Sequence, residues 1–320
     1  MIKIRTVSDL DECARLWKRV FHHDSLFCLW ELRNCFQTEF NRRPHFVVAE
    51  EYGRLLGLLP LAWVSESQEY AFFPGETWQQ KTWLERNRIW AVDEVVAHAM
   101  FATLDAPFML RYLERDSVPS QFAGIEPDET RYLFDPSDYV YSFELYQTRF
   151  SAKSLRKINR EIEALSAPGV VLRYNDPGDV SLLLEMNLAS FGEHSYFHDA
   201  RFLGAFERVV AWLRDRNAVL TTTVLIGGRA AAVDLGVVWD GTYILLAGGT
   251  DRTFPGVAKL INFHHLRYSC QQRFREVDFL CGDFGWKERF RLTPRTLFKI
   301  AGPAVIQHPE ENCTVVGASR

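Results

Sequence analysis

The chain has 320 residues, a formal charge of −4 and 47% hydrophobic residues. These values are typical of a folded protein with one large domain or two, and they exclude disordered, collagen-like and low-complexity proteins. The slightly acidic balance also excludes a general attraction to nucleic acid or anionic lipid. The six cysteines form no CxxC pair and no zinc-type cluster with histidine. Neither a metal site nor a disulfide framework is therefore predicted.

The N-terminal residues lack the apolar core of a signal peptide. No uninterrupted apolar run approaches the roughly 18 residues that a membrane span needs. We therefore expect a cytoplasmic protein.

The first half is predicted to contain a strand, two helices and a hairpin in that order. Gly53 can supply the positive φ that the hairpin turn needs. The segment 119–138, rich in Pro, Asp, Glu and Ser, is predicted to be an irregular connection. The expected elements are a strand over 1–7, helices over 10–21 and 26–40, strands over 45–49, 55–64 and 70–73, a helix over 91–103 and an extended segment over 107–112.

The second half repeats this order. Two-residue turns at Gly227-Gly228 and Asp240-Gly241 predict a three-stranded antiparallel meander. The repetition favours two copies of one α+β module, over residues 1–140 and 141–320. The expected elements are a basic helix over 151–165, a strand over 170–174, helices over 180–190 and 200–214, strands over 218–226, 229–239 and 242–247, a helix from 257 to about 274 and a buried strand over 277–281.

A glycine-bearing loop after Ala247 leads into the helix that begins near Val257. The first turn of a helix has unpaired N–H groups and a partial positive charge, and Gly256 permits close approach of a phosphate or pyrophosphate. The segment contains neither GxxxxGK[ST] nor GxGxxG, which disfavours a P-loop and a dinucleotide site. Many strand–helix junctions use glycines only to turn, so a structural role stays open.

The strand over 277–281 is expected to run parallel to the strand over 242–247, because a helix joins them. Where two parallel strands diverge, unpaired backbone groups can bind an extended ligand as a pseudo-strand. Such a slot suits a pantetheine arm.

Three motifs in residues 150–300 carry a resemblance to a known family. They are a GxxxA hairpin at Gly228–Ala232, the PG pair at Pro255-Gly256, and a DFxxGD…K ending that runs from Asp278 to Lys287. In order and spacing they are similar to the C-terminal module of GNAT-superfamily acyltransferases grouped with Fem-type aminoacyltransferases and acetyltransferases of cellulose biosynthesis. The resemblance implies a mixed α+β fold of two tandem GNAT-like modules, each a mostly antiparallel sheet with a parallel splayed pair and flanking helices.

The resemblance also implies an N-acyltransferase, with the module over residues 1–140 on the acceptor side and the module over 141–320 for thioester binding and catalysis. It would move an acyl group from acyl-CoA, in the first instance acetyl-CoA, to an amine of a small molecule or a cell-envelope precursor, without a metal. The loop departs from the common Q/R-x-x-G-x-G/A pattern. An aminoacyl-tRNA donor, as in Fem-type enzymes, and a catalytically silent ligand-binding module therefore remain alternatives.

The residues expected to bind the donor lie on the strand before the loop, in the loop and at the helix start. They are Leu246, Ala247, Gly248, Arg252, Thr253, Phe254, Pro255, Gly256, Val257 and Ala258.

Attack of an amine on a thioester needs a neutral amine, stabilisation of negative charge and a proton for the thiolate. Lys287 matches the family's terminal lysine and is expected to hold an acceptor carboxylate or to stabilise that charge. Asp283 is expected to deprotonate the amine or to orient Lys287. Asp234, a carboxylate among apolar neighbours in mid-strand, is the second candidate base. Tyr243 is a candidate proton donor, with core packing as its alternative.

The loop over 191–198 is expected to cover the acceptor cleft. Glu193 is a further candidate base, and His194, His198 and Trp286 are candidate acceptor contacts. A polar loop without catalytic duty is the alternative.

Two other clusters have plainer interpretations. The basic helix over 151–165 carries Lys153, Arg156, Lys157 and Arg160; it is either a solvated face or, with a tRNA donor, a contact surface. Adjacent helical residues point about 100° apart. His264 and His265 are therefore not expected to share a metal; one of them is expected to face the core and the other to be exposed.

Overall fold

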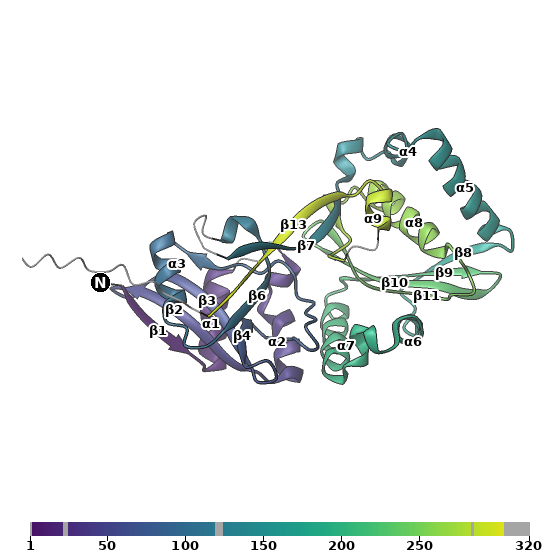
Figure 1. Cartoon of the computed structure of the whole chain (residues 1–320). Helices are drawn as coiled ribbons and strands as arrows, with labels where there is room; N and C mark the ends of the chain where they lie inside the picture. The colour runs from purple at the N-terminus through teal and green to yellow at the C-terminus, as the bar shows by residue number, and fades with distance from the viewer. Residues whose placement is uncertain (1, 22–24, 119–123, 283–284, 304–320) are drawn as a thin grey trace, which may run out of the picture.

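The computed structural model describes residues 2–21, 25–118, 124–282 and 285–303. Its described strands form one sheet in the order β1-β2-β3-β4-β6-β13-β7-β12-β11-β10-β9-β8, with β5 paired to β3 (Figure 1). The strands are β1 (Lys3–Val7), β2 (Arg43–Glu51), β3 (Arg54–Val64), β4 (Glu69–Phe72), β5 (Trp90–Ala91), β6 (Phe108–Leu113), β7 (Ile125–Phe134), β8 (Val170–Tyr174), β9 (Val219–Ile226), β10 (Arg229–Trp239), β11 (Thr242–Thr250), β12 (Glu276–Asp278) and β13 (Thr293–Gly302).

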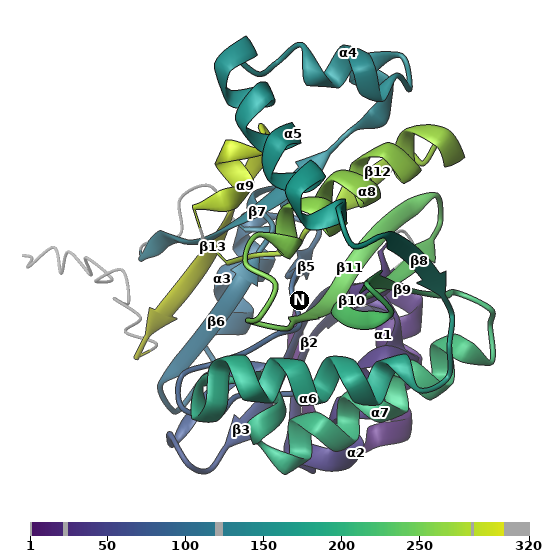
Figure 2. The ribbon, with the colours of Figure 1, turned by 90° about the vertical axis from the view of Figure 1, so that its right-hand side faces the viewer.

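Helices pack on both faces of the second half of this sheet. Figure 2 shows α5 and α8 on one face and α6 and α7 on the other. The α-helices in the described residues are α1 (Leu10–Val20), α2 (Trp30–Phe40), α3 (Glu94–Phe101), α4 (Phe143–Gln147), α5 (Ala152–Ser166), α6 (Asp179–Phe191), α7 (Ala200–Arg214), α8 (Val257–Gln272) and α9 (Trp286–Arg289).

The expected tandem architecture is confirmed. In the first half β1 to β4 pair antiparallel, β4 pairs parallel with β6, and α3 lies between them in sequence. In the second half β8 to β11 pair antiparallel, β11 pairs parallel with β12, and α8 lies between them. The hairpin glycines Gly53 and Gly228 both have positive φ, at 75° and 81°. Each half is thus an antiparallel sheet with one parallel pair and flanking helices.

Each half also lends a strand to the other. β7 pairs with β12 and with β13, and β13 pairs in turn with β6. The sheet is therefore continuous across residue 140, where we predict the division between the modules.

The prediction that 119–138 lacks regular structure is wrong for β7, which lies inside the sheet. Charges that are unfavourable in an isolated strand have partners here: Arg131 donates to Asp278 at 2.8 Å and to Glu276 at 3.1 Å. Pro127 pairs opposite Phe298 beside a shift in register, and a bulge is where a sheet tolerates proline. Tertiary pairing therefore overrides the local composition.

The two halves share one apolar core where α2 packs on α7. Phe36 and Phe202 lie with ring centroids 5.6 Å apart, and Trp83, from the loop between β4 and β5, lies 5.8 Å from Phe202. Because these rings are buried together, the loop of the first half is held against the second half, where it forms part of the candidate site.

Candidate functional site

A cavity of about 500 Å³ lies where β11 and β12 diverge. The two strands pair only over Thr242–Ile244 and Glu276–Asp278, whereas β11 continues to Thr250. The predicted strand over 277–281 is therefore too long. It stops at Asp278, after which Leu280 and Gly282 take positive φ values of 57° and 100° and the chain turns away.

Both halves of the chain line this cavity. The lining residues are Trp83, Tyr112, Glu129, Asn187, Phe191, Tyr196, Phe197, Phe202, Asp234, Leu245, Leu246, Ala247, Gly248, Gly249, Thr250, Ala258, Ile261, Asn262, Phe279, Leu280, Cys281, Gly282, Trp286 and Lys287.

The N-terminus of α8 adjoins the cavity and can bind an anion. Gly256 is the N-cap, with φ +91° and no side-chain capping bond, and the first turn of α8 contains no acidic residue. Two N–H groups of this first turn are already used: those of Val257 and Lys259 donate to the carbonyls of Phe254 and Gly256 at 3.1 and 2.9 Å. The positive end of the helix dipole carries no opposing side-chain charge in that turn. The basic helix α5 lies beside α8 (Figure 2), with Lys259 paired to Glu161. Its residues Lys153, Arg156, Lys157 and Arg160 are exposed.

The residues predicted to bind the donor fall into two groups. Leu246, Ala247, Gly248 and Ala258 line the cavity. The others lie in the loop that leads from β11 to α8, or at the start of α8; they are Arg252, Thr253, Phe254, Pro255, Gly256 and Val257.

That loop is ordered by its own hydrogen bonds. The N–H groups of Thr253 and Phe254 donate to the side chain and the carbonyl of Asp251, at 2.8 and 3.1 Å. The guanidinium of Arg252 donates to the carbonyl of Ser190. The loop therefore reaches α8 in a fixed turn.

Asp234 on β10 faces the cavity and belongs to a buried hydrogen-bond chain. His265 Nε2 lies 2.9 Å from Asp234 Oδ2, and the Tyr243 hydroxyl lies 3.1 Å from His265 Nδ1. Since a carboxylate only accepts, the His265 proton sits on Nε2, and Tyr243 donates to Nδ1. His265 and Tyr243 thus hold one carboxylate oxygen.

The other carboxylate oxygen, Asp234 Oδ1, lies over Gly248. A Cβ on Gly248 would approach Oδ1 to 2.3 Å, so only glycine leaves room for the carboxylate there. On the next residue, a Cβ on Gly249 would meet the Leu183 carbonyl at 2.7 Å. The two glycines thus serve different contacts, the first with Asp234 and the second with α6.

Tyr243 is not positioned to donate a proton directly to a ligand. Its side chain is fully buried and is absent from the cavity wall. Burial, with the negative charge of Asp234 as the next cause, raises its pKa well above the ordinary value. Its hydroxyl therefore stays protonated and acts on the cavity only through His265 and Asp234.

Lys287 lines the cavity, but its ammonium group is already bound. Nζ donates to the carbonyls of Phe279, Leu280 and Cys281 at 2.8, 2.7 and 2.8 Å. It lies in α9 rather than at a strand end. Burial lowers its pKa. With three carbonyls bound by its three N–H donors, Lys287 fixes the cavity wall and offers no donor to an acceptor carboxylate.

Glu85 is a buried acid that the sequence analysis missed. It lies on the loop of the first half, where its Oε1 accepts from the Cys281 N–H at 2.7 Å and its Oε2 has no partner. Burial, followed by the charge of Asp278, raises its pKa to about 7. Glu85 and Lys287 together hold residues 279–281. Sequence periodicity gives no signal for Glu85, because its contact joins two irregular segments.

The segment 191–198 borders the cavity with other residues than predicted. Glu193, His194 and His198 are exposed and do not line it. The carbonyls of Glu193 and His194 instead accept from Lys81 Nζ at 3.4 and 3.0 Å. The rings that face the cavity are those of Phe191, Tyr196 and Phe197.

The remaining predicted residues divide as follows. Trp286 lines the cavity and packs against Phe279 at 5.7 Å between ring centroids. Asp283 lies outside the described residues. His265 is the core-facing histidine of its pair, as predicted, and His264 is half-buried.

The described residues contain no group of three or more His, Cys, Asp or Glu side chains that could hold a metal ion. Within the same part of the chain, no helix has the length and apolar character to cross a membrane.

Comparisons with known proteins agree with this architecture. Solved structures of similar fold include FemX (TM-score 0.55, 10% identity, covering 93% of this chain and 96% of that one) and a tandem GNAT protein of the clavulanic acid biosynthesis pathway (0.50, 14%, 95% and 99%). A conserved protein of unknown function from Bacteroides thetaiotaomicron is also similar (0.52, 13%, 94% and 99%). At these identities the likeness shows the fold alone.

Sequence comparison agrees for the second half. No curated protein matches the chain. Residues 151–288 match the family model described as Acetyltransferase (GNAT) domain. The predicted resemblance to GNAT-superfamily acyltransferases with tandem modules is therefore confirmed: the second half carries the family match, and the whole chain shares the fold.

Proposed function

We propose that the protein is an N-acyltransferase that moves an acyl group from acyl-CoA, in the first instance acetyl-CoA, to an amine. The observation that supports this most is the cavity between the diverging strands β11 and β12, which adjoins the open N-terminus of α8 and contains the carboxylate of Asp234.

The described residues fit a CoA thioester. Residues 245–249 of β11 have no partner strand on the side that β12 leaves, so their backbone groups can bind an extended pantetheine arm. Gly256 and the first turn of α8 can hold the pyrophosphate. We propose that the loop residues Arg252 to Pro255, which lead from β11 to α8, also contribute to pyrophosphate binding.

Asp234 is the proposed general base. In the transfer the amine nitrogen bonds to the acyl carbon while the carbon–sulfur bond breaks, and the thiolate that leaves takes a proton from water to become the free thiol. Asp234 takes the proton that the amine gives up, because Oδ1 faces the cavity while Oδ2 is held by His265. Lys287 and Glu85 act as positioning residues that hold the wall at 279–281.

An aminoacyl-tRNA donor is the second candidate. The exposed cations of α5 beside α8 are the observation that favours it, because tRNA binding needs a positive surface. The shared fold with FemX is compatible with either donor.

Thiol release on addition of acetyl-CoA and a panel of primary amines tests the proposal. We expect amine-dependent release by the wild-type protein and almost none by Asp234→Asn. Absence of binding by acetyl-CoA and longer acyl-CoA, with transfer from a charged tRNA, would establish the second candidate. Binding without any transfer would indicate a silent ligand-binding module.

A further inference from the structure

We infer that the acceptor is a primary amine on an aromatic or similarly flat apolar body, and that it carries no carboxylate or phosphate. This inference rests on the proposed function, because it concerns the half of the cavity that the donor leaves open. It follows from the side chains that form that half and from how their polar groups are already used.

The acceptor side of the cavity is walled by aromatic rings. They come from the first half (Trp83, Tyr112), from the segment after α6 (Tyr196, Phe197) and from α7 (Phe202). The rings contact one another, with Tyr196 and Trp83 at 5.3 and 5.8 Å from Phe202. Flat apolar ligands pack well against such walls.

The two tyrosines present their rings rather than their hydroxyls. The Tyr196 hydroxyl donates to the carbonyl of Thr82 at 3.1 Å, and the Tyr112 hydroxyl lies 3.3 Å from both that carbonyl and Glu129 Oε1. Burial raises the pKa of each above the ordinary value, so both stay neutral. Neither hydroxyl is therefore free to bind a polar acceptor without losing an existing bond.

The two asparagines of the wall are occupied as well. Asn187 donates to the Gly248 carbonyl at 2.8 Å and accepts from the Ser195 hydroxyl at 2.7 Å. Asn262 donates to the carbonyl of Ala258 at 2.7 Å. These bonds take one N–H of each asparagine and the Oδ1 of Asn187, so neither side chain offers all of its polar groups to a ligand.

The charged side chains of the cavity wall favour a cationic ligand. Of the described residues that line the cavity, the charged ones are Glu129, Asp234 and Lys287, and the ammonium of Lys287 is bound by three carbonyls. Glu129 accepts from Arg111 at 3.2 Å, but Arg111 also binds Asp128 at 2.6 Å. One guanidinium between two carboxylates leaves a net negative charge at this wall.

This arrangement discriminates between amines. A carboxylate or phosphate on the acceptor would lose its water without gaining a cation from the described wall, which is costly. An ammonium group gains the charge of Glu129 and contact with the faces of aromatic rings. The ammonium gives one proton to water when it becomes the nucleophile, and Asp234 takes the second proton during the transfer.

Paired ligands that differ by one carboxylate test the inference. Calorimetric titration of the full chain, without donor, with tryptamine and with tryptophan isolates the carboxylate, because the ring and the amine are shared. We expect tryptamine to bind at least about tenfold more tightly, a difference of about 1.4 kcal/mol. Pentylamine, which lacks a ring, should bind more weakly than tryptamine.

A matched pair of variants locates the effect. Glu129→Gln should weaken tryptamine binding about five- to tenfold, within the range that a desolvated charge and ring contact can supply. Glu207→Gln, an exposed acid on α7, should leave it unchanged. Equal or tighter binding of tryptophan, no binding of tryptamine, or an unaltered affinity in Glu129→Gln would overturn the inference.

Thiol release from acetyl-CoA separates this inference from the proposed function. Selective tryptamine binding without thiol release would leave the amine site standing and remove the acyl transfer. Thiol release with tryptophan and not with tryptamine would support the acyl transfer and overturn the inference about the acceptor.

Discussion

The two halves of the molecule share a topology but differ at the helix that follows the splayed strand. In the second half α8 begins at Gly256, with no acidic residue in its first turn. In the first half α3 begins at Asp93, whose side chain accepts from the Val96 N–H at 2.8 Å, and its first turn contains Glu94. These carboxylates satisfy and oppose the positive end of α3.

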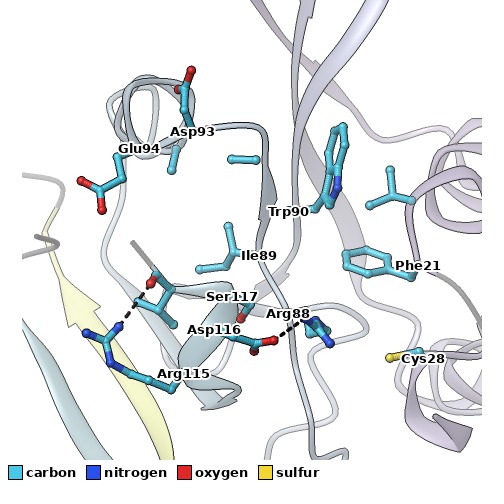
Figure 3. A pocket seen from close by; sticks show the side chains of 14 residues that line it. Phe21, Cys28, Arg88, Ile89, Trp90, Asp93, Glu94, Arg115, Asp116 and Ser117 are labelled. Carbon is cyan, nitrogen blue, oxygen red and sulfur yellow. Dashed lines mark hydrogen bonds and ion pairs between the residues drawn. The ribbon is translucent and has the colours of Figure 1, made fainter. Parts of the chain in front are cut away.

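The cavities of the first half also contain charged side chains that are paired or acidic. A cavity of about 710 Å³ lies beside the start of α3. Asp93 and Glu94 line it, as does Arg88, which pairs with Asp116 at 2.8 Å (Figure 3). A third cavity, of about 670 Å³, borders β4 and β6, and its Arg111 is paired with Asp128. The corresponding helices therefore begin differently: α8 starts at a glycine without a side-chain cap or an acidic first turn, and α3 starts at a capping aspartate followed by a glutamate.

The largest expected effect concerns Asp234, the proposed general base of the second half. Asp234→Asn keeps the shape and an acceptor for His265 but removes the proton acceptor, so we expect kcat to fall by about 10²–10⁴. Asp105→Asn alters the first-half carboxylate that accepts from Tyr70 at 3.0 Å and should leave kcat within about twofold. Steady-state kinetics with acetyl-CoA checks both. Full turnover by Asp234→Asn would remove Asp234 from the mechanism.

Lys287 is expected to matter mainly through structure. Lys287→Met removes the donor to the carbonyls of Phe279 and Cys281, while the carbonyl of Leu280 keeps the Tyr132 N–H at 3.3 Å. The free energy of unfolding should therefore fall by about 3–5 kcal/mol. Lys18→Met, which breaks an exposed pair with Glu31 in the first half, should cost about 0.5 kcal/mol. Urea denaturation measures both. In the folded Lys287→Met protein the KM for the donor should rise more than kcat falls; an unchanged KM and a large loss of kcat would indicate a direct catalytic role.

Glu85 should make stability depend on pH. Its pKa is raised from 4.5 to about 7 in the folded protein. Between these values the folded chain keeps a proton that the unfolded chain releases, so this contribution to stability is lost as pH rises from about 5 to about 7 and is constant above. Relative to Glu85→Gln, the wild type should lose about 2 kcal/mol of unfolding free energy across that window.

Urea denaturation of both proteins at several pH values measures this difference. Because the other titrating groups are shared, they cancel in the comparison to first order. Parallel pH profiles for the two proteins would contradict the buried, protonated Glu85.

The smallest expected effect concerns the start of α8. Gly256→Ala places a side chain at φ +91°, a backbone conformation that costs an L-residue roughly 1–2 kcal/mol, and this strain distorts the helix start. The Kd for acetyl-CoA should therefore rise about five- to tenfold, a free-energy change of similar size. Gly53→Ala, at φ +75° in the first-half hairpin, carries similar strain and should leave the Kd unchanged. If the two substitutions changed the Kd for acetyl-CoA equally, donor binding would not depend on the start of α8.

The sequence predicts the elements that local patterns determine. The strand at Arg229–Trp239 and the helix at Ala200–Arg214 have the predicted bounds, because alternating and helical apolar spacing is strong there. The motif around Pro255-Gly256 likewise predicts the helix start. Local signals of this kind explain why the tandem architecture could be predicted.

Contacts between distant segments account for what the sequence does not predict. β7 is held by Arg131 and its partners on β12, and no local pattern encodes that pairing. His265 joins Asp234 across 31 positions, and Glu85 meets Cys281 across 196. Lys287 shows the same limit: its family match is visible in sequence, whereas the three carbonyls that occupy it depend on the turn after β12.

The most direct test of the account is calorimetric titration with acetyl-CoA of two matched variants that fill a cleft. Ala258→Trp fills the cavity beside β11, and Met109→Trp fills the corresponding first-half cleft beside β4. The account predicts one acetyl-CoA per chain in the wild type, loss of binding in Ala258→Trp and unchanged binding in Met109→Trp. Binding that survives Ala258→Trp, or that is lost in Met109→Trp, would contradict it.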